Sequence, residues 1–361
     1  MKRTFLRTAA LLVAAVLLFP VQAQAISARR AMVLDAVTGR TLYERRAGER
    51  SLIASTTKIM TALVVCRRCN VLDRVKIPRE AVGVEGSSMY LREGEILTVQ
   101  ELLYGLMLCS GNDAAVALAI YCGGTVEGFA ELMNDKAREL GMTGSHFENP
   151  NGLDAPRHYS TARDLAILAA EAMKDPVFAQ TVSTRSVRVG DRELRNHNKL
   201  LWRLEGADGV KTGYTRAAGR ILVSSACRQG RRLICVTIDA PDDWNDHERL
   251  LERAFGLYTL REAVPAGEKV GRIPVLGGAE MEVQLCTAKS FSYPLAQGET
   301  PRIQLPAEQF CYAPVARGAP AGTAYVRLGK TVIGSLPLVY GATVELAQEE
   351  KQPLWRRIFG G

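Results

Sequence analysis

The stretch IASTTKIMT, residues 53–61, decides how the rest of this chain is interpreted. If a helix begins here, the three-residue spacing places Ser55 and Lys58 on one face, about one turn apart. A serine hydroxyl becomes a nucleophile when a neighbouring base removes its proton, and a desolvated lysine can be neutral enough to act as that base. A chain of this length contains about one Ser-x-x-Lys by chance. The motif therefore needs support from elsewhere in the sequence.

The residues that follow favour a helix. Between residues 57 and 65 the apolar side chains of Ile59, Met60, Leu63 and Val64 recur at helical spacing, so this helix is expected to be buried along one side. The N-terminus of a helix also directs free N–H groups toward Ser55, which favours negative charge developing there.

Composition indicates an exported globular protein. The chain has 361 residues, 47% hydrophobic and 23% charged, which is enough for one large domain and a second one. Residues 1–25 combine a basic start, a short apolar run and an A-x-A ending, which is typical of a secretory signal peptide cleaved after Ala25. They hold three positive charges and no negative ones, so the net charge falls from +8 to +5 on cleavage. We expect a location in the cell envelope, and no patch suggests nucleic acid binding.

Cysteine and histidine spacing argues against a metal centre. All eight cysteines follow the leader, and an even number in an exported chain permits disulfides. They are Cys66, Cys69, Cys109, Cys122, Cys227, Cys235, Cys286 and Cys311. The Cys66-x-x-Cys69 pair lacks the further ligands of a structural metal site, and no His pair has metalloprotease spacing. We expect a structural or incidental cysteine pair, with no metal and no other cofactor.

The first two thirds of the chain predict strands at both ends of a helical block. A hairpin is expected over residues 31–43, a β-rich segment over 182–189, and a second hairpin from 221–223 and 233–238, with 211–213 on a strand beside it. Helices are expected over 100–108, 114–120, 125–140, 161–173, with a Thr161–Asp164 capping box, and 247–260. This order predicts an α/β or α+β domain whose sheet draws on both ends of the chain.

The sequence pattern changes from residue 265 onward. Short, partly alternating segments separated by Gly or Pro predict a small β-sandwich over residues 269–274, 280–285, 301–305, 324–328 and 331–339. The final residues 353–359 mix apolar and basic side chains. They suit a weak interfacial membrane anchor and a frayed terminus equally well.

Three short motifs occur in order along the chain: Ser55-x-x-Lys58, Ser110-x-Asn112 and Lys211-Thr212-Gly213. With their surroundings ASTTKIMT, SGNDAA, NPNGL and KTGYT, they resemble the low-molecular-mass penicillin-binding proteins that are serine D-alanyl-D-alanine carboxypeptidases. The resemblance covers about residues 28–345. After the predicted signal peptide at 1–25, it implies a penicillin-binding/β-lactamase-like catalytic domain at 26–262 and a β-rich domain at 263–345, which leaves a tail at 346–361.

The resemblance implies three catalytic residues. Ser55 would attack the carbonyl between the two terminal D-alanines of a peptidoglycan pentapeptide, forming an acyl-enzyme and releasing D-alanine. Lys58 would take the serine proton, and its pKa should be lowered. Ser110, together with Lys211, would relay a proton to the leaving amine. β-Lactam antibiotics, which imitate the substrate, would leave Ser55 acylated.

The same resemblance implies the substrate-binding residues. Asn112 would bind the peptide amide, while Lys211 would also hold Lys58 in register. Thr212, beside Gly213, would contact the substrate carboxylate, and the backbone N–H groups of Ser55 and Tyr214 would form an oxyanion hole. Family members use an arginine for the terminal carboxylate, and spacing does not choose among Arg216, Arg220 and Arg249. The stretch around Asn198 resembles a family segment and a solvent-facing loop equally.

Three other functions share these motifs. A D,D-endopeptidase would cut cross-links with the same residues and is the nearest alternative. A class A β-lactamase needs a glutamate followed four residues later by asparagine, but Gly152 stands four residues after Glu148. A non-catalytic penicillin-binding scaffold has no physical need for two amines beside one hydroxyl. The carboxypeptidase is therefore the favoured prediction.

Overall fold

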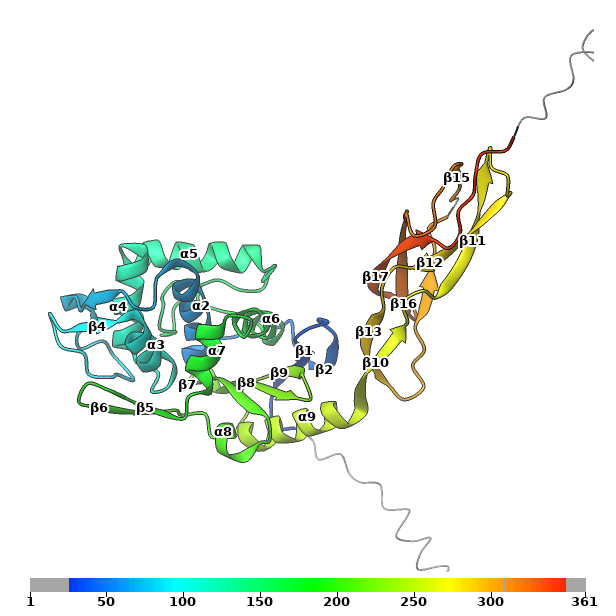
Figure 1. Cartoon of the computed structure of the whole chain (residues 1–361). Coiled ribbons are helices and arrows are strands. Elements are labelled where there is room, and N and C mark those ends of the chain that lie inside the picture. Colours follow the sequence, from blue (N-terminus) through cyan, green and yellow to red (C-terminus); the bar gives the residue numbers. More distant parts are fainter. Residues whose placement is uncertain (1–25, 308, 349–361) are drawn as a thin grey trace, which may run out of the picture. The chain divides into compact units, whose positions relative to one another are not determined.

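The computed structural model describes residues 26–307 and 309–348. The predicted signal peptide and residues 349–361 of the predicted tail lie outside the described residues. The chain divides into two compact units. One comprises the residues up to Ala36 together with Tyr43–Leu251, and the other comprises Val37–Leu42 together with the residues from Glu252 onward. Figure 1 shows the elements of each unit.

The first unit is built on a five-stranded sheet in the order β2-β1-β9-β8-β7. Its strands are β1 (Arg30–Asp35), β2 (Thr41–Arg45), β7 (Ala207–Thr215), β8 (Gly219–Arg228) and β9 (Arg231–Ile238). The strand β1 pairs antiparallel with β9, so residue Val33 lies opposite Cys235. This pairing confirms the predicted α/β fold class, in which strands from the beginning and the end of the first unit form one sheet.

Helices cover both faces of this sheet (Figure 1). On one face, Ile221 and Val223 of β8 belong to the large core that also holds α2 (Lys58–Arg68), α6 (Ala162–Ala172) and α7 (Pro176–Ser183). Side chains alternate along a strand, so Ser224 points to the other face. There its hydroxyl bonds Nδ1 of His247 at 2.6 Å, from helix α9 (Asp243–Leu257). Helix α9 therefore packs on the face of the sheet that is opposite the main core, where Ser224 contacts His247.

The remaining helices form the block beside the sheet. They are α3 (Val99–Met107), α4 (Asn112–Gly123) and α5 (Val126–Glu139), close to the predicted bounds. The short elements of this unit are β3 (Arg74–Lys76), η2 (Arg79–Ala81), β4 (Ile96–Thr98), β5 (Ser186–Val189), β6 (Arg192–Arg195) and α8 (Leu200–Arg203). No single helix in the described ranges is long and apolar enough to cross a membrane; α4 and α5 pass that test only as a pair bent by 83°.

Three local predictions are corrected by the structure. Val182 lies in helix α7, not at the start of a strand, because Asp175 caps that helix and Pro176 begins it. The Thr161 cap forms, with the hydroxyl accepting from the N–H of Asp164, but Asp164 does not complete a capping box. Its carboxylate instead accepts from Gly144 N and Ser145 Oγ. Helix α9 begins four residues before His247, with Asp243 in its first turn.

The second unit confirms a β-rich C-terminal fold. A six-stranded sheet runs in the order β14-β16-β17-β12-β11-β15, and a separate pair joins β10 to β13. The strands are β10 (Tyr258–Val264), β11 (Lys269–Leu276), β12 (Glu282–Thr287), β13 (Phe291–Ala296), β14 (Arg302–Gln304), β15 (Cys311–Tyr312), β16 (Pro320–Leu328) and β17 (Thr331–Tyr340). The sequence patterns missed β10, β13 and β15. Pro294 within β13 is unfavourable in a central strand but is tolerated in a two-stranded sheet.

The Cys-x-x-Cys motif does not act as a unit. The thiol of Cys69 is hydrogen-bonded to that of Cys122 on α4, and this contact, with burial, raises the pKa of Cys69. The same contact, with Arg68 nearby, lowers the pKa of Cys122. Burial raises the pKa of Cys66 to about 12. The partner of Cys69 is thus distant in sequence, which spacing alone does not reveal.

Candidate active site

Ser55 lies in a short 3-10 turn, η1 (Ala54–Thr57), that leads directly into α2. Ala54 adopts φ of +45°, an uncommon conformation for a residue with a side chain. The turn is fastened by Thr56, whose N–H and hydroxyl both donate to Ile53 O. Ser55 is half-buried while its neighbours on both sides are buried. The strained turn therefore presents a single hydroxyl at the surface of the core.

Lys58 is fully buried directly behind this hydroxyl. Its Nζ lies 3.0 Å from Ser55 Oγ, 2.6 Å from Asn112 Oδ1 and 2.6 Å from the Asn151 carbonyl oxygen. Burial, and then the positive charge of Lys211, lower the pKa of Lys58 well below its usual value. A neutral amine has two N–H donors and one lone pair. Because both carbonyl oxygens can only accept, the lone pair of the neutral amine is left facing Ser55.

Asn112 begins helix α4 and orients Lys58. Its Nδ2 donates to the Glu85 carbonyl at 2.5 Å, which turns Oδ1 toward the lysine. The backbone N–H of Asn112 donates to Ser87 O at 2.7 Å. Just before it, Ser110 is buried with φ of +64°. The polar break between α3 and α4 is thus held in an uncommon backbone conformation against the loop that contains Glu85.

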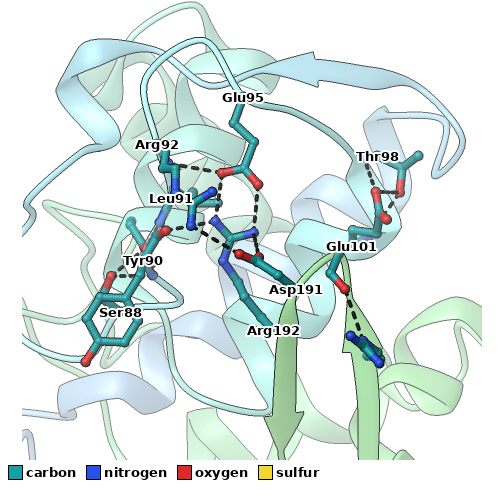
Figure 2. A network of polar contacts seen from close by, with 12 residues as sticks. Ser88, Tyr90, Leu91, Arg92, Glu95, Thr98, Glu101, Asp191 and Arg192 are labelled. Atoms are coloured by element: carbon teal, nitrogen blue, oxygen red, sulfur yellow. Dashed lines mark hydrogen bonds and ion pairs between the residues drawn. The ribbon is translucent and has the colours of Figure 1, made fainter.

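That loop is fastened from two sides (Figure 2). Asp113, which is buried, accepts from Ser88 Oγ and from the backbone N–H groups of Met89 and Leu91. Arg192, on the β5–β6 hairpin, donates to both carboxylate oxygens of Glu95 at 2.7 and 2.8 Å and to the Tyr90 carbonyl at 2.8 Å.

Figure 2 also shows Arg92 bonded to Asp191 of the same hairpin, and the complete capping box of Thr98 and Glu101 that begins α3. These contacts hold in place the loop whose Glu85 and Ser87 carbonyl groups accept hydrogen bonds from Asn112. They also fix the hairpin that leads into residues 195–203.

Strand β7 forms the other wall of the site. It is the edge strand of the sheet and packs against η1, so its outer edge faces Ser55. Gly213 permits this approach, because a Cβ there would lie 3.2 Å from Ile53 O and 3.3 Å from Ser55 N. Lys211 is buried, its Nζ donates to Thr212 O at 3.0 Å, and burial lowers its pKa to about 8.

The side chains of the three motifs meet at one pocket of about 360 Å³. Ser55, Ser110, Thr212, Gly213 and Tyr214 line it. Lys58, Asn112 and Lys211 are buried, and Lys58 is bonded to both Ser55 and Asn112. Burial and then the charge of Lys211 lower the pKa of Lys58. In the structure both ends of the Asn112 side chain are occupied by Glu85 and Lys58. Residues far apart in sequence thus converge on Ser55.

Asn151 and Gly152 complete the site, and the motif search assigned them no role. The carbonyl of Asn151 accepts from Lys58. Gly152 has φ of +86°, and a Cβ on it would lie 1.9 Å from Ala54 O, so only glycine lets this loop pass behind the serine turn. The NPNGL motif indicated a loop at this place. It could not predict the contact with Lys58, because that contact uses the backbone carbonyl of Asn151, a group that every residue has.

The structure separates the three candidate arginines. Arg220 lines the pocket that contains Ser55, and its Nη2 donates to both oxygens of Asp243 at 2.8 and 3.0 Å. Arg249 is paired with Asp246 on its own helix and with Asp242, which immediately precedes that helix. Arg216 is exposed and is not among the pocket-lining residues.

Two other sequence-based alternatives are settled by burial and contacts. Asn198 itself is buried and does not face solvent, whereas His197 and Lys199 on either side of it are exposed; the Oδ1 of Asn198 accepts from Leu200 N at 3.1 Å. The carboxylate of Glu148 is bonded to the backbone and side chain of Arg157. Glu148 is not among the residues that line the pocket.

The fold and this site define a serine-peptidase class, and comparison with known proteins gives the family. Residues 18–242 match the family described as D-alanyl-D-alanine carboxypeptidase, and residues 258–346 match the penicillin-binding protein 5 C-terminal domain. The chain therefore belongs to the D-alanyl-D-alanine carboxypeptidase family of low-molecular-mass penicillin-binding proteins.

Individual relatives agree over most of the chain. It is 32% identical to D-alanyl-D-alanine carboxypeptidase DacF of Bacillus subtilis over 86% of this chain and 84% of the relative. It is 33% identical to DacC of Escherichia coli, over 90% and 86%. The solved structure of penicillin binding protein 5 from Haemophilus influenzae superposes with a TM-score of 0.76 at 30% identity, covering 90% of this chain and 100% of that one.

Proposed function

We propose that this protein removes the terminal D-alanine from peptidoglycan stem peptides through an acyl-enzyme on Ser55, and that β-lactams acylate the same hydroxyl. The observation that carries the proposal is the contact set of Lys58. With two carbonyl oxygens occupying its N–H donors, a buried neutral amine has only its lone pair left for Ser55. The separation of 3.0 Å is within the range for direct proton transfer.

Acylation follows from this geometry. Lys58 takes the proton of Ser55 as Oγ attacks the substrate carbonyl, and the backbone N–H groups of Ser55 and Tyr214 stabilise the oxyanion. Ser110, with Lys211, delivers a proton to the departing nitrogen, and D-alanine leaves. Water then hydrolyses the ester. The free edge of β7 offers backbone hydrogen bonds to an extended peptide, with Thr212 near its carboxylate.

The setting is the cell envelope, outside the cytoplasm. A signal peptide at residues 1–25 and a substrate found in the cell wall both support this location. We also propose that the tail contacts a membrane surface, because residues 353–359 mix apolar and basic side chains.

Release of free D-alanine tests the function directly. The mature chain, from residue 26, is incubated with a pentapeptide ending in D-Ala-D-Ala, and we expect one D-alanine per peptide. Prior treatment with penicillin should abolish the release. A chain that binds penicillin covalently but releases no D-alanine would be a penicillin-binding scaffold, and the proposed activity would be wrong.

Arg220 is the arginine that we propose for the substrate carboxylate, since it is the candidate that lines the pocket with Ser55. A hydrogen bond to a charged group contributes about 1.5–3 kcal/mol, so Arg220→Gln is expected to raise KM by about 10- to 100-fold with a smaller change in kcat. Steady-state kinetics with the pentapeptide measure this split.

Two comparisons make the Arg220 prediction specific. Arg216→Gln, which removes an exposed arginine of the same segment, should leave KM within about twofold. A pentapeptide whose terminal carboxylate is converted to an amide should bind Arg220→Gln and the unaltered protein equally. If Arg216→Gln and Arg220→Gln raise KM alike, the assignment is wrong.

A further inference from the structure

Two cysteines that are far apart in the sequence meet where helices α2 and α4 end. Cys69 caps the C-terminus of α2, and Cys122 lies in the last turn of α4. Their thiols are hydrogen-bonded to each other. Both residues are half-buried, within reach of a small reagent, and both are free thiols in this structure. The contact therefore brings together two sulfur atoms that a disulfide could join.

The packing of α2 against α4 accounts for this contact. At the N-terminal ends of the two helices, Lys58 Nζ lies 2.6 Å from Asn112 Oδ1. The helices have nearly equal lengths of 11 and 12 residues. Each residue of a helix adds about 1.5 Å of length, so the C-terminal ends of two helices that run in the same direction lie at nearly the same level. The helix pair is thus joined by a catalytic contact at one end and by two thiols at the other.

A second contact holds the end of α4 against the segment that follows α2. The hydroxyl of Tyr121, the residue before Cys122, donates to Asp73 Oδ2 at 2.9 Å. Asp73 lies four residues after Cys69. This hydrogen bond keeps the two backbone segments close together, which is the geometric condition for a disulfide between them.

The surroundings of the two thiols make Cys122 the nucleophile of the pair. The hydrogen bond from Cys69, aided by the positive charge of Arg68, lowers the pKa of the Cys122 thiol. The same hydrogen bond, with burial, raises the pKa of Cys69. The thiolate is the form that attacks a disulfide. Cys66, three residues before Cys69, is a poor nucleophile, because burial raises its pKa to about 12.

We propose that Cys69 and Cys122 are joined by a disulfide in the mature protein, formed by a disulfide-bearing oxidant of the cell envelope. The oxidant follows from the proposed location outside the cytoplasm. The Cys122 sulfur attacks one sulfur of the oxidant, whose S–S bond breaks and releases a first thiol. The Cys69 sulfur then attacks the Cys122 sulfur of the mixed disulfide and releases the second thiol. The protein loses two electrons and two protons, and the oxidant gains them.

This disulfide clamps the two helices that carry Lys58 and Asn112, at the ends remote from those residues. It also closes the chain between Cys69 and Cys122 into a loop that contains all of α3. A cross-link restricts such a segment in the unfolded chain and so stabilises the folded protein. Reduction of the bond is expected to lower the temperature of thermal unfolding by about 5–10 °C. The bond is independent of the proposed reaction, because neither cysteine is among the residues that line the pocket with Ser55.

Peptide mapping of the folded mature chain tests for the bond. The protein is incubated with excess oxidised glutathione, the remaining thiols are alkylated, and an unreduced digest is analysed by mass spectrometry. Trypsin cuts the chain between Cys66 and Cys69, and a protease that cleaves before Asp113 separates Cys109 from Cys122. We expect a pair of peptides that joins Cys69 to Cys122 and that separates on reduction.

Cys69→Ser is the test variant, and Cys66→Ser, on the same helix, is its matched control. The control should form the bond and unfold about 5–10 °C lower when reduced, as the unaltered protein does, whereas reduction should not affect Cys69→Ser.

Three results would overturn the inference. The first is an oxidised, unaltered protein in which Cys69 and Cys122 are both alkylated, or in which Cys122 carries glutathione without a cross-link. The second is a cross-link that leaves the unfolding temperature unchanged. The third is a Cys69→Ser protein whose unfolding temperature falls on reduction as much as that of the unaltered protein. The peptide map needs no variant, so it decides the question even if Cys69→Ser does not fold.

Discussion

Ser55→Ala is expected to abolish covalent labelling by fluorescent penicillin and to lower kcat for D-alanine release by at least about 10⁴-fold, because removal of a nucleophile eliminates the acyl-enzyme route. The fold should survive, since Ser55 is half-buried and its hydroxyl is hydrogen-bonded to Lys58. Thermal unfolding of the variant should therefore occur within a few degrees of the unaltered protein.

Ser87→Ala serves as the control for Ser55→Ala. Ser87 is exposed at the rim of the same pocket and supports Asn112 through its backbone carbonyl, which the substitution retains. This variant should still be labelled by penicillin. Labelling of Ser55→Ala at the normal rate, with mass spectrometry placing the adduct elsewhere, would remove Ser55 as the nucleophile.

Lys58→Met is expected to slow acylation by penicillin by about 10²- to 10⁴-fold, the usual contribution of a positioned general base. Methionine keeps much of the volume of lysine but supplies no lone pair for Ser55. Because Lys58 acts in its neutral form, acylation by the unaltered protein should slow as the pH falls through the lowered pKa of this lysine. That decline should be lost in Lys58→Met. Stopped-flow acylation over a range of pH measures both effects.

The stability of Lys58→Met should be measured alongside its rate. The substitution leaves the Asn151 carbonyl and Asn112 Oδ1 without their buried donor, at about 1–3 kcal/mol for each unpaired group. Lys174→Met, which removes an exposed lysine paired with Glu171, provides the comparison for both properties. A Lys58→Met protein that is folded and acylates normally would exclude Lys58 as the base.

Much of the fold could be predicted because its signals are local. The helices α3, α4 and α5 follow apolar periodicity and recognisable caps, such as Thr98 and Thr125. Errors arose where a tertiary contact competes with a local rule. Asp164 does not form its predicted capping box, because its carboxylate accepts hydrogen bonds from Gly144 N and Ser145 Oγ instead.

The three motifs predicted the main residues of the site but not the groups that hold those residues in position. Ser55 and Lys58 are three residues apart, so their contact follows from helical geometry. The carbonyl of Asn151 has no side-chain signature, and the selection of Arg220 over Arg249 depends on the packing of a sheet and a helix. Such roles are set by backbone position and by burial, which short patterns do not encode.

Sequence alone determined that a serine and a lysine stand one turn apart, that two further motifs follow in order, and that a β-rich segment comes after them. Each of these depends on local spacing. Only the tertiary structure decided that Lys58 is buried, with its Nζ 3.0 Å from Ser55 Oγ and 2.6 Å from each of two carbonyl oxygens, and that Arg220 rather than Arg216 lines the pocket. Burial and convergence are properties of residues far apart in the chain, so they arise only when the chain folds.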